Sequence, residues 1–118
     1  MLQSGALSNL NKIIYVSSGG TVYGVPQSIP IDESHHTDPI CAYGIHKLAC
    51  EKYLQLFHFM RKIDIAILRV SNIYGPLQEI ARPFGAVEAF MRRSMLDEPI
   101  DIWGDGSTTR DYRLNQRT

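Results

Sequence analysis

Tyr43 and Lys47 stand four residues apart in the sequence. On a helix, residues at this spacing share one face, so the phenol and the ammonium can converge on one ligand. A phenol is a poor proton acceptor at neutral pH, but a neighbouring positive charge favours the phenolate. The pair therefore predicts a general acid/base. An exposed helix face also produces such a pair by chance, so both interpretations stay open on this evidence alone.

The elements that must position this pair begin with strand, helix and strand. Residues 12–17 and 64–70 are nearly continuous apolar runs, which are typical of parallel strands covered on both faces. Asp38-Pro39 predicts the start of a helix of about twenty residues that ends at residues 61–62. The predicted buried face of this helix holds Ile45, Leu48, Ala49, Leu56, Phe57 and Met60.

Shorter elements follow toward the C-terminus. Residues 84–96 are apolar on one side, which predicts a helix, and residues 99–103 predict a short strand. Turns are expected at residues 72–76 and 104–106. Residues 24–39 carry several prolines and acidic residues, which predicts a long loop, and a loop of that length is usually functional.

This order of elements predicts an α/β fold, a parallel sheet with flanking helices in three layers. In such folds the ligand lies beyond the carboxyl ends of the strands. Those ends are expected at residues 17–21, 71–75 and 104–106, so these three loops should hold the chemistry.

Composition excludes several classes of partner. Twelve basic and twelve acidic side chains in 118 residues give a net charge of zero, which argues against nucleic acid binding. No apolar run reaches the roughly 18 residues of a membrane span, and no signal peptide is evident at the start, so a cytoplasmic protein is expected. Cys41 and Cys50 would lie roughly 13 Å apart on one helix, too far for a disulfide. His46 and Cys50 lack further ligands, so no metal is expected.

Five segments, in order and at matching spacing, resemble one family. They are Ser17–Gly24, Pro30–Glu33, Tyr43–Lys47, Leu68–Pro76 and Ile102–Tyr112. Together they resemble the extended short-chain dehydrogenase/reductases, the NAD-dependent epimerase/dehydratase family that acts on nucleotide sugars, most closely its UDP-glucose 4-epimerases. The resemblance implies a partial Rossmann-like sheet, NAD as the cofactor and a UDP-sugar or other nucleotide sugar as the substrate.

The resemblance also implies a mechanism. Tyr43 would take a proton from a sugar hydroxyl while NAD accepts a hydride from the same carbon, and Lys47 would hold the nicotinamide ribose. The oxidised sugar could then turn over or lose water before the hydride returns. Epimerisation is expected and dehydration is the alternative, because the family's dehydratases typically carry an acidic pair where Gly20 and Thr21 stand here.

Further site residues follow only from the resemblance. Gly19 stands where the family usually has the Ser or Thr that bonds the reacting hydroxyl, so Ser18 or Thr21 would supply it. Asn72 and Arg110 would contact the substrate diphosphate, although a turn residue and a solvated charge would look the same. The implied cofactor contacts are Ser17, Tyr43, Lys47 and Val70, and the implied substrate contacts are Tyr23, Asn72 and Arg110.

Two features depart from the family pattern. The sequence contains no Gly-x-x-Gly-x-x-Gly loop of the kind that holds the NAD pyrophosphate, and residues 113–118 abandon the usual continuation. Residues 1–118 are therefore expected to be a fragment of one epimerase/dehydratase domain, without that loop and without the C-terminal substrate-binding part. A catalytically inactive fragment is the alternative to an enzyme. The resemblance also implies a homodimer formed through the long helix.

Overall fold

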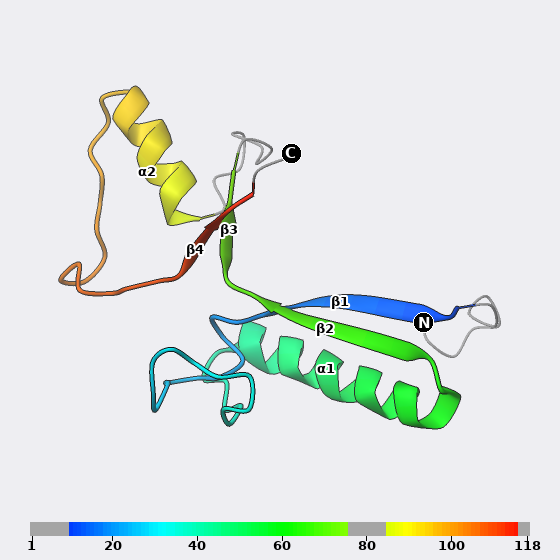
Figure 1. Cartoon of the computed structure of the whole chain (residues 1–118). Coiled ribbons are helices and arrows are strands. Elements are labelled where there is room, and N and C mark those ends of the chain that lie inside the picture. The colour runs from blue at the N-terminus through cyan, green and yellow to red at the C-terminus, as the bar shows by residue number, and fades with distance from the viewer. Residues whose placement is uncertain (1–9, 76–84, 116–118) are drawn as a thin grey trace. The chain divides into compact units, whose positions relative to one another are not determined.

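The structure, a computed structural model, describes residues 10–75 and 85–115 (Figure 1). The chain divides into two compact units, unit 1 with residues 1–70 and unit 2 with residues 71–118. Each unit contains its own pair of parallel strands and one helix.

Unit 1 is a strand–helix–strand unit. Strands β1 (Lys12–Ser18) and β2 (Asp64–Val70) pair in parallel along their whole lengths, and helix α1 (Ala42–Arg61) connects them. Figure 1 shows α1 lying along one face of the β1–β2 pair. The predicted α/β class with parallel strands and a flanking helix is confirmed.

The ends of α1 are set by local hydrogen bonds. Cys41 has extended backbone (φ −132°), and its Sγ accepts a hydrogen bond from the Gly44 amide at 3.4 Å. The cap is therefore Cys41, and the prediction that the helix starts at Asp38 is wrong. At the other end Lys62 adopts the left-handed conformation (φ 57°), and its amide donates to the His58 carbonyl at 2.9 Å, which confirms the predicted end.

The face of α1 that packs on the sheet differs from the prediction. Its buried residues are Gly44, Glu51 and Leu54. Leu48 and Phe57 are half-buried as expected, but four members of the predicted face are exposed, because α1 carries apolar residues on two sides and periodicity does not tell which side meets the sheet. The exposed four are Ile45, Ala49, Leu56 and Met60.

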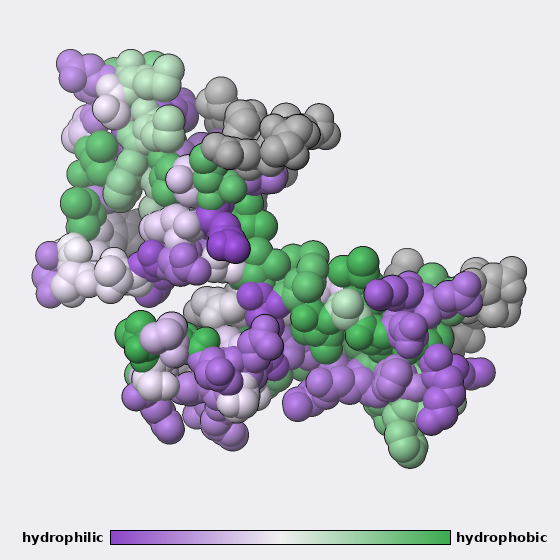
Figure 2. Space-filling view, viewed as in Figure 1, coloured by the Kyte–Doolittle hydropathy of each residue, from purple (hydrophilic) through white to green (hydrophobic). Residues whose placement is uncertain are grey.

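The opposite face of the β1–β2 pair is apolar and exposed in the part of unit 1 that the structure describes. Ile14, Val16 and Leu68 each expose about half of their surface or more on this face. Figure 2 shows the resulting apolar surface over β1 and β2. Strands covered on both faces were predicted, and unit 1 as described covers one.

Unit 2 pairs two short strands that the sequence did not predict. Strand β3 (Asn72–Tyr74) lies parallel to β4 (Tyr112–Leu114), where a turn and no element had been expected. The rings of Tyr74 and Tyr112 pack edge to face, with 6.4 Å between their centres. Both strands have three residues, which is too short for an alternating pattern to be distinctive.

Helix α2 (Ala86–Met95) confirms the helix predicted over residues 84–96, and the predicted Phe84 lies outside the described residues. The strand predicted at residues 99–103 is wrong. This segment is held by Arg93, whose Nη1 donates to the Pro99 carbonyl at 2.7 Å and to Asp101 Oδ2 at 2.8 Å. A side chain of α2 therefore takes the place of a strand partner.

Gly44 is required where α1 meets the loop after β1. A Cβ added at Gly44 would lie 2.5 Å from the Thr21 carbonyl oxygen and 2.9 Å from the Pro39 side chain. We expect Gly44→Ala to lower the free energy of unfolding by about 1–2 kcal/mol, because overpacking outweighs the better helix propensity of alanine. Urea unfolding measures this, with Gly20→Ala as the control, because a Cβ at Gly20 meets nothing within 4 Å. Equal stability of the two variants would contradict the prediction.

Candidate active site

Tyr43 and Lys47 lie on the first two turns of α1, and the structure brings them together as predicted. The Lys47 Nζ lies 5.6 Å from the centre of the Tyr43 ring. The same Nζ donates a hydrogen bond to the Val16 carbonyl of β1 at 2.9 Å. Lys47 is thus half-buried against the sheet, while Tyr43 remains 56% exposed. A fixed ammonium beside an accessible phenol is the arrangement that proton transfer to a bound ligand needs.

A second tyrosine lies near the same ammonium. The Lys47 Nζ is 5.2 Å from the centre of the Tyr15 ring, which β1 turns toward α1. Burial raises the pKa of Tyr15 to about 12, and a hydrogen bond with Cys50 and the nearby Glu51 charge add to the rise. Tyr15 therefore stays a neutral phenol at physiological pH, and Tyr43 is the exposed phenol beside Lys47.

The loop after β1 shows why this chain has glycine where the resemblance implies Ser or Thr. A Cβ at Gly19 would lie 2.9 Å from the Arg69 carbonyl oxygen, so any larger residue would have to push the loop away from β2. The Gly19 amide also donates to the Val70 carbonyl at 2.9 Å. Within the described part of the chain, the buried Thr21 Oγ1 has no hydrogen-bond partner, whereas Ser18 is the last residue of β1. Of the two candidate hydroxyls, that of Thr21 is thus enclosed and has no partner among the described residues.

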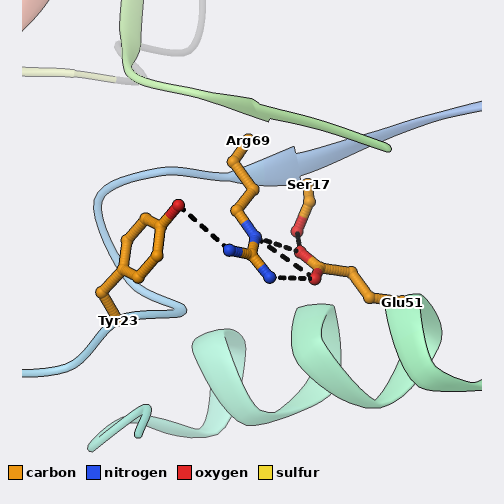
Figure 3. Close-up of polar contacts among 4 residues, drawn as sticks. All are labelled: Ser17, Tyr23, Glu51 and Arg69. Carbon is orange, nitrogen blue, oxygen red and sulfur yellow. Dashed lines mark hydrogen bonds and ion pairs between the residues drawn. The ribbon is translucent and has the colours of Figure 1, made fainter. Parts of the chain in front are cut away.

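Sequence reasoning missed the polar contacts that join β1, β2 and α1. Ser17 and Arg69 are opposite one another in the β1–β2 register, and both face α1. There they meet Glu51, which is 1% exposed (Figure 3). Glu51 accepts a hydrogen bond from the Ser17 hydroxyl, and the Arg69 guanidinium donates to both of its oxygens at 2.8–3.3 Å. We call these residues, together with Tyr23, the Glu51 network.

Tyr23 completes the Glu51 network from the loop. Arg69 Nη1 donates to the Tyr23 hydroxyl at 3.0 Å, and the guanidinium carbon lies 4.9 Å from the centre of the Tyr23 ring. Ser17 and Tyr23 are 4% and 6% exposed, so both hydroxyls point into the fold. Their implied side-chain contacts with cofactor and substrate gain no support from this geometry, and we assign both side chains to the network.

The charges of the network fix its protonation. Burial disfavours the ionised form of Glu51, but hydrogen bonds from Arg69 and then Ser17 outweigh it and hold the pKa of that carboxyl below its ordinary value. The hydrogen bond with Glu51 likewise raises the pKa of Arg69 above its usual range. The pair therefore remains ionised across physiological pH.

One sequence signal could have found this network. Arg69 interrupts the apolar run of β2 on the side that alternation turns toward the helix, where Ile65 and Ile67 also lie. A charge on a buried strand face requires a partner. Glu51 has helical spacing from Lys47, so a search for that partner would have reached it.

The two implied diphosphate contacts lie in unit 2. The Asn72 side-chain amide donates to the Asp111 carbonyl at 3.0 Å. Asp111 directly follows Arg110 in the sequence. Arg110 is exposed, and its Nη1 donates to the neighbouring Thr109 carbonyl at 3.1 Å. Both predicted residues are thus near the start of β4, Asn72 through its hydrogen bond to Asp111 and Arg110 through its place just before the strand.

The remaining candidate groups are the two cysteines and any cluster of metal ligands. Cys41 and Cys50 are free thiols. Among residues 10–75 and 85–115, no three potential metal-ligating side chains gather, and no helix there is long and apolar enough to span a bilayer.

Comparison with known proteins decides the family. A sequence model of the NAD dependent epimerase/dehydratase family matches residues 1–113. This chain belongs to that family. The UDP-glucose 4-epimerase of Mycolicibacterium smegmatis is 33% identical to it over 112 residues, which cover 95% of this chain and 36% of that relative.

Solved structures of family members agree. The UDP-glucose 4-epimerase of Thermotoga maritima, solved with UDP-glucose, matches 90% of this chain with a TM-score of 0.85 and 36% identity. The UDP-glucose 4-epimerase of Thermus thermophilus, solved with NAD, matches 88% with a TM-score of 0.76 and 29% identity. In both cases 35% of the longer chain is covered, so this chain spans about a third of the length of the family members it matches.

The ionised Glu51 makes stability depend on pH. Because its pKa is lowered on folding, its contribution is present above about pH 4.5 and is lost as the pH falls further. We expect Glu51→Gln to destabilise the fold by about 3–5 kcal/mol at pH 7, since Arg69 is left without its partner. Urea unfolding at about pH 7 and about pH 3.5, which lie above and below the ordinary carboxyl pKa, measures both effects. If the variant lost as much stability on acidification as the wild type, Glu51 would not be the group that titrates.

Proposed function

We propose that this chain carries the proton-transfer residues of an NAD-dependent nucleotide-sugar epimerase of the UDP-glucose 4-epimerase type. The observation that carries the proposal is the Lys47 ammonium, held by the Val16 carbonyl at 2.9 Å beside the exposed Tyr43 ring. Membership of the epimerase/dehydratase family supports the reaction class.

Each residue of the pair has one task in this proposal. Tyr43 accepts the proton of a sugar hydroxyl and returns it after the sugar carbon has been inverted. Lys47 holds its ammonium beside Tyr43, 5.6 Å from the centre of the ring. Thr21 bonds the reacting hydroxyl with its Oγ1, which is buried and has no partner among the described residues.

NAD would accept and return the hydride of that carbon when bound. The chain fits the nicotinamide end of such a cofactor, because in the described residues the Lys47 ammonium makes one hydrogen bond and can donate two more to ribose hydroxyls. The other proposed cofactor contacts are the main chain of Ser17 and Val70, at the carboxyl ends of β1 and β2. The solved Thermus thermophilus relative holds NAD, which supports this choice.

A nucleotide sugar is the proposed substrate, and a UDP-sugar is the first candidate because the solved Thermotoga maritima relative holds UDP-glucose. Arg110 is exposed, and its planar guanidinium suits a diphosphate. Asn72 lies beside it through its hydrogen bond to Asp111. We propose that these two residues bind the diphosphate, in a protein of the cytoplasm.

Tyr43→Phe tests the proposed proton transfer. The variant keeps the ring but has no phenolic oxygen, so we expect turnover of UDP-glucose to UDP-galactose to fall by about 10²–10⁴-fold. Coupled-enzyme detection of UDP-galactose measures the rate, and calorimetric titration with the UDP-sugar should give an unchanged affinity. Tyr53→Phe is the control, because Tyr53 is exposed on the same helix. A Tyr43→Phe variant as active as the wild type would refute the assignment.

Two alternatives remain for the same assay. Formation of a 4-keto-6-deoxy sugar instead of UDP-galactose would identify a dehydratase, although Gly20 and Thr21 provide no acidic pair for it. The second alternative is a catalytically silent chain, which the lack of a Gly-x-x-Gly-x-x-Gly sequence favours. Replacing the matching segment of the Thermotoga maritima enzyme with residues 10–115 separates these cases. An active graft with an inactive full chain would mean that the pair is competent and that activity needs parts of the relative outside the grafted segment.

The homodimer implied by the resemblance stays a prediction. The exposed side of α1 carries Ile45, Leu56 and Met60 at helical spacing, an apolar stripe that a second copy could cover. We expect sedimentation equilibrium to give about twice the monomer mass, and Leu56→Lys to shift it toward the monomer. A wild-type chain that sediments as a monomer at all concentrations would contradict this prediction.

A further inference from the structure

Two contacts tie α1 to β1 at successive helical turns, one from Lys47 and one from the Glu51 network. The Lys47 ammonium bonds the Val16 carbonyl, and one turn later Glu51 accepts a hydrogen bond from the hydroxyl of the next strand residue, Ser17. Two contacts one turn apart fix how far α1 can slide along the strand. The position of Lys47 along β1 therefore depends on Glu51.

The same network also ties down the loop after β1. The Arg69 guanidinium lies between Glu51 and Tyr23 and donates to the Tyr23 hydroxyl, as Figure 3 shows. Two residues before Tyr23, the Thr21 carbonyl packs against Gly44, the residue that follows Tyr43. Holding Tyr23 thus holds the proposed hydroxyl donor against the turn of α1 that carries the proposed base.

Stability alone is a weak reason for such a group of charges. Apolar residues of similar volume often stabilise a fold as well as a buried ion pair, because two charges must be desolvated to form it. What an apolar contact lacks is direction. The Arg69 fork and the Ser17 hydroxyl hold both Glu51 oxygens at defined positions, which an apolar contact of the same size would not do.

We infer that Glu51, held by Arg69, is a positioning residue that sets where the part of α1 that carries Tyr43 and Lys47 lies relative to β1 and to the Thr21 loop. This inference rests on the proposed function. Glu51 acts through these neighbours and does not itself touch the ligand, because its side chain is enclosed by Ser17 and Arg69.

Glu51→Asp tests the inference with the charge unchanged. The shorter side chain withdraws the carboxylate by about 1.5 Å, one carbon–carbon bond, so α1 must shift or lose a contact. In the full chain we expect acetylation of Lys47 by acetic anhydride to become severalfold faster relative to the exposed Lys52, as read by mass spectrometry. Glu98→Asp, an exposed carboxylate in unit 2, is the control and should leave this ratio unchanged.

A second variant separates the contact of Arg69 with Tyr23 from its contacts with Glu51. Tyr23→Phe removes the acceptor of Arg69 Nη1 and leaves the Glu51 contacts in place. We expect faster amide hydrogen exchange in residues 19–23 with no change in the Lys47-to-Lys52 acetylation ratio. A change in that ratio equal to the one in Glu51→Asp would overturn the inference that the Glu51 contacts, and not the Tyr23 contact, position Lys47.

Turnover distinguishes positioning from mere stabilisation. In the protein that shows epimerase activity, full chain or graft, we expect Glu51→Asp to lower kcat by about 10–100-fold with KM for the UDP-sugar little changed. A variant with a lower melting temperature but the kcat of Glu98→Asp would overturn the inference and leave the proposed function standing. Absence of turnover in both the wild-type chain and the graft would overturn the proposed function. The acetylation ratio would then still decide whether Glu51 positions Lys47.

Discussion

The carboxylate of Glu51 is the point on which unit 1 depends. It is enclosed, ionised and bonded to a residue of each strand, so the helix and the strands cannot move apart without exposing an unpaired charge. The apolar core around it is small, with Val22 and Leu54 as its buried aliphatic side chains in the described residues. A small core supplies little directional information. In unit 1 the polar contacts of Glu51 fix how α1 and the strands lie relative to one another. These contacts are at the carboxyl ends of the strands, where ligands bind in parallel sheets.

This arrangement also explains how Lys47 can be half-buried and still be available to a ligand. Its stem lies against β1 between two aromatic rings, which shields the ammonium and fixes its position, while one hydrogen bond to Val16 satisfies part of its donor capacity. Of the two rings, Tyr15 is held neutral by burial and Tyr43 is open to solvent. The same cation thus faces one phenol that stays protonated and one that a ligand can reach.

The correct predictions from the sequence concern features that lie within one helix or strand. The strands at residues 12–17 and 64–70 and the convergence of Tyr43 with Lys47 follow from runs and spacings within one element. The errors concern choices between elements: which of two apolar sides of α1 meets the sheet, and whether Arg93 or a strand holds residues 99–103. The Glu51–Arg69 pair joins residues 18 apart on α1 and β2, so it too depends on which side of α1 meets the sheet.

The loop after β1 shows a departure from a family pattern that has a steric cause. Gly19 lies so close to the Arg69 carbonyl that a side chain there would push the loop off β2, and Arg69 is held in place by Glu51. Thr21 lies two residues further along the same loop and is anchored on the other side by Gly44, which admits its carbonyl because it lacks a Cβ. The loop is therefore held close to β2 at Gly19 and close to α1 at Thr21, and both close approaches depend on a glycine.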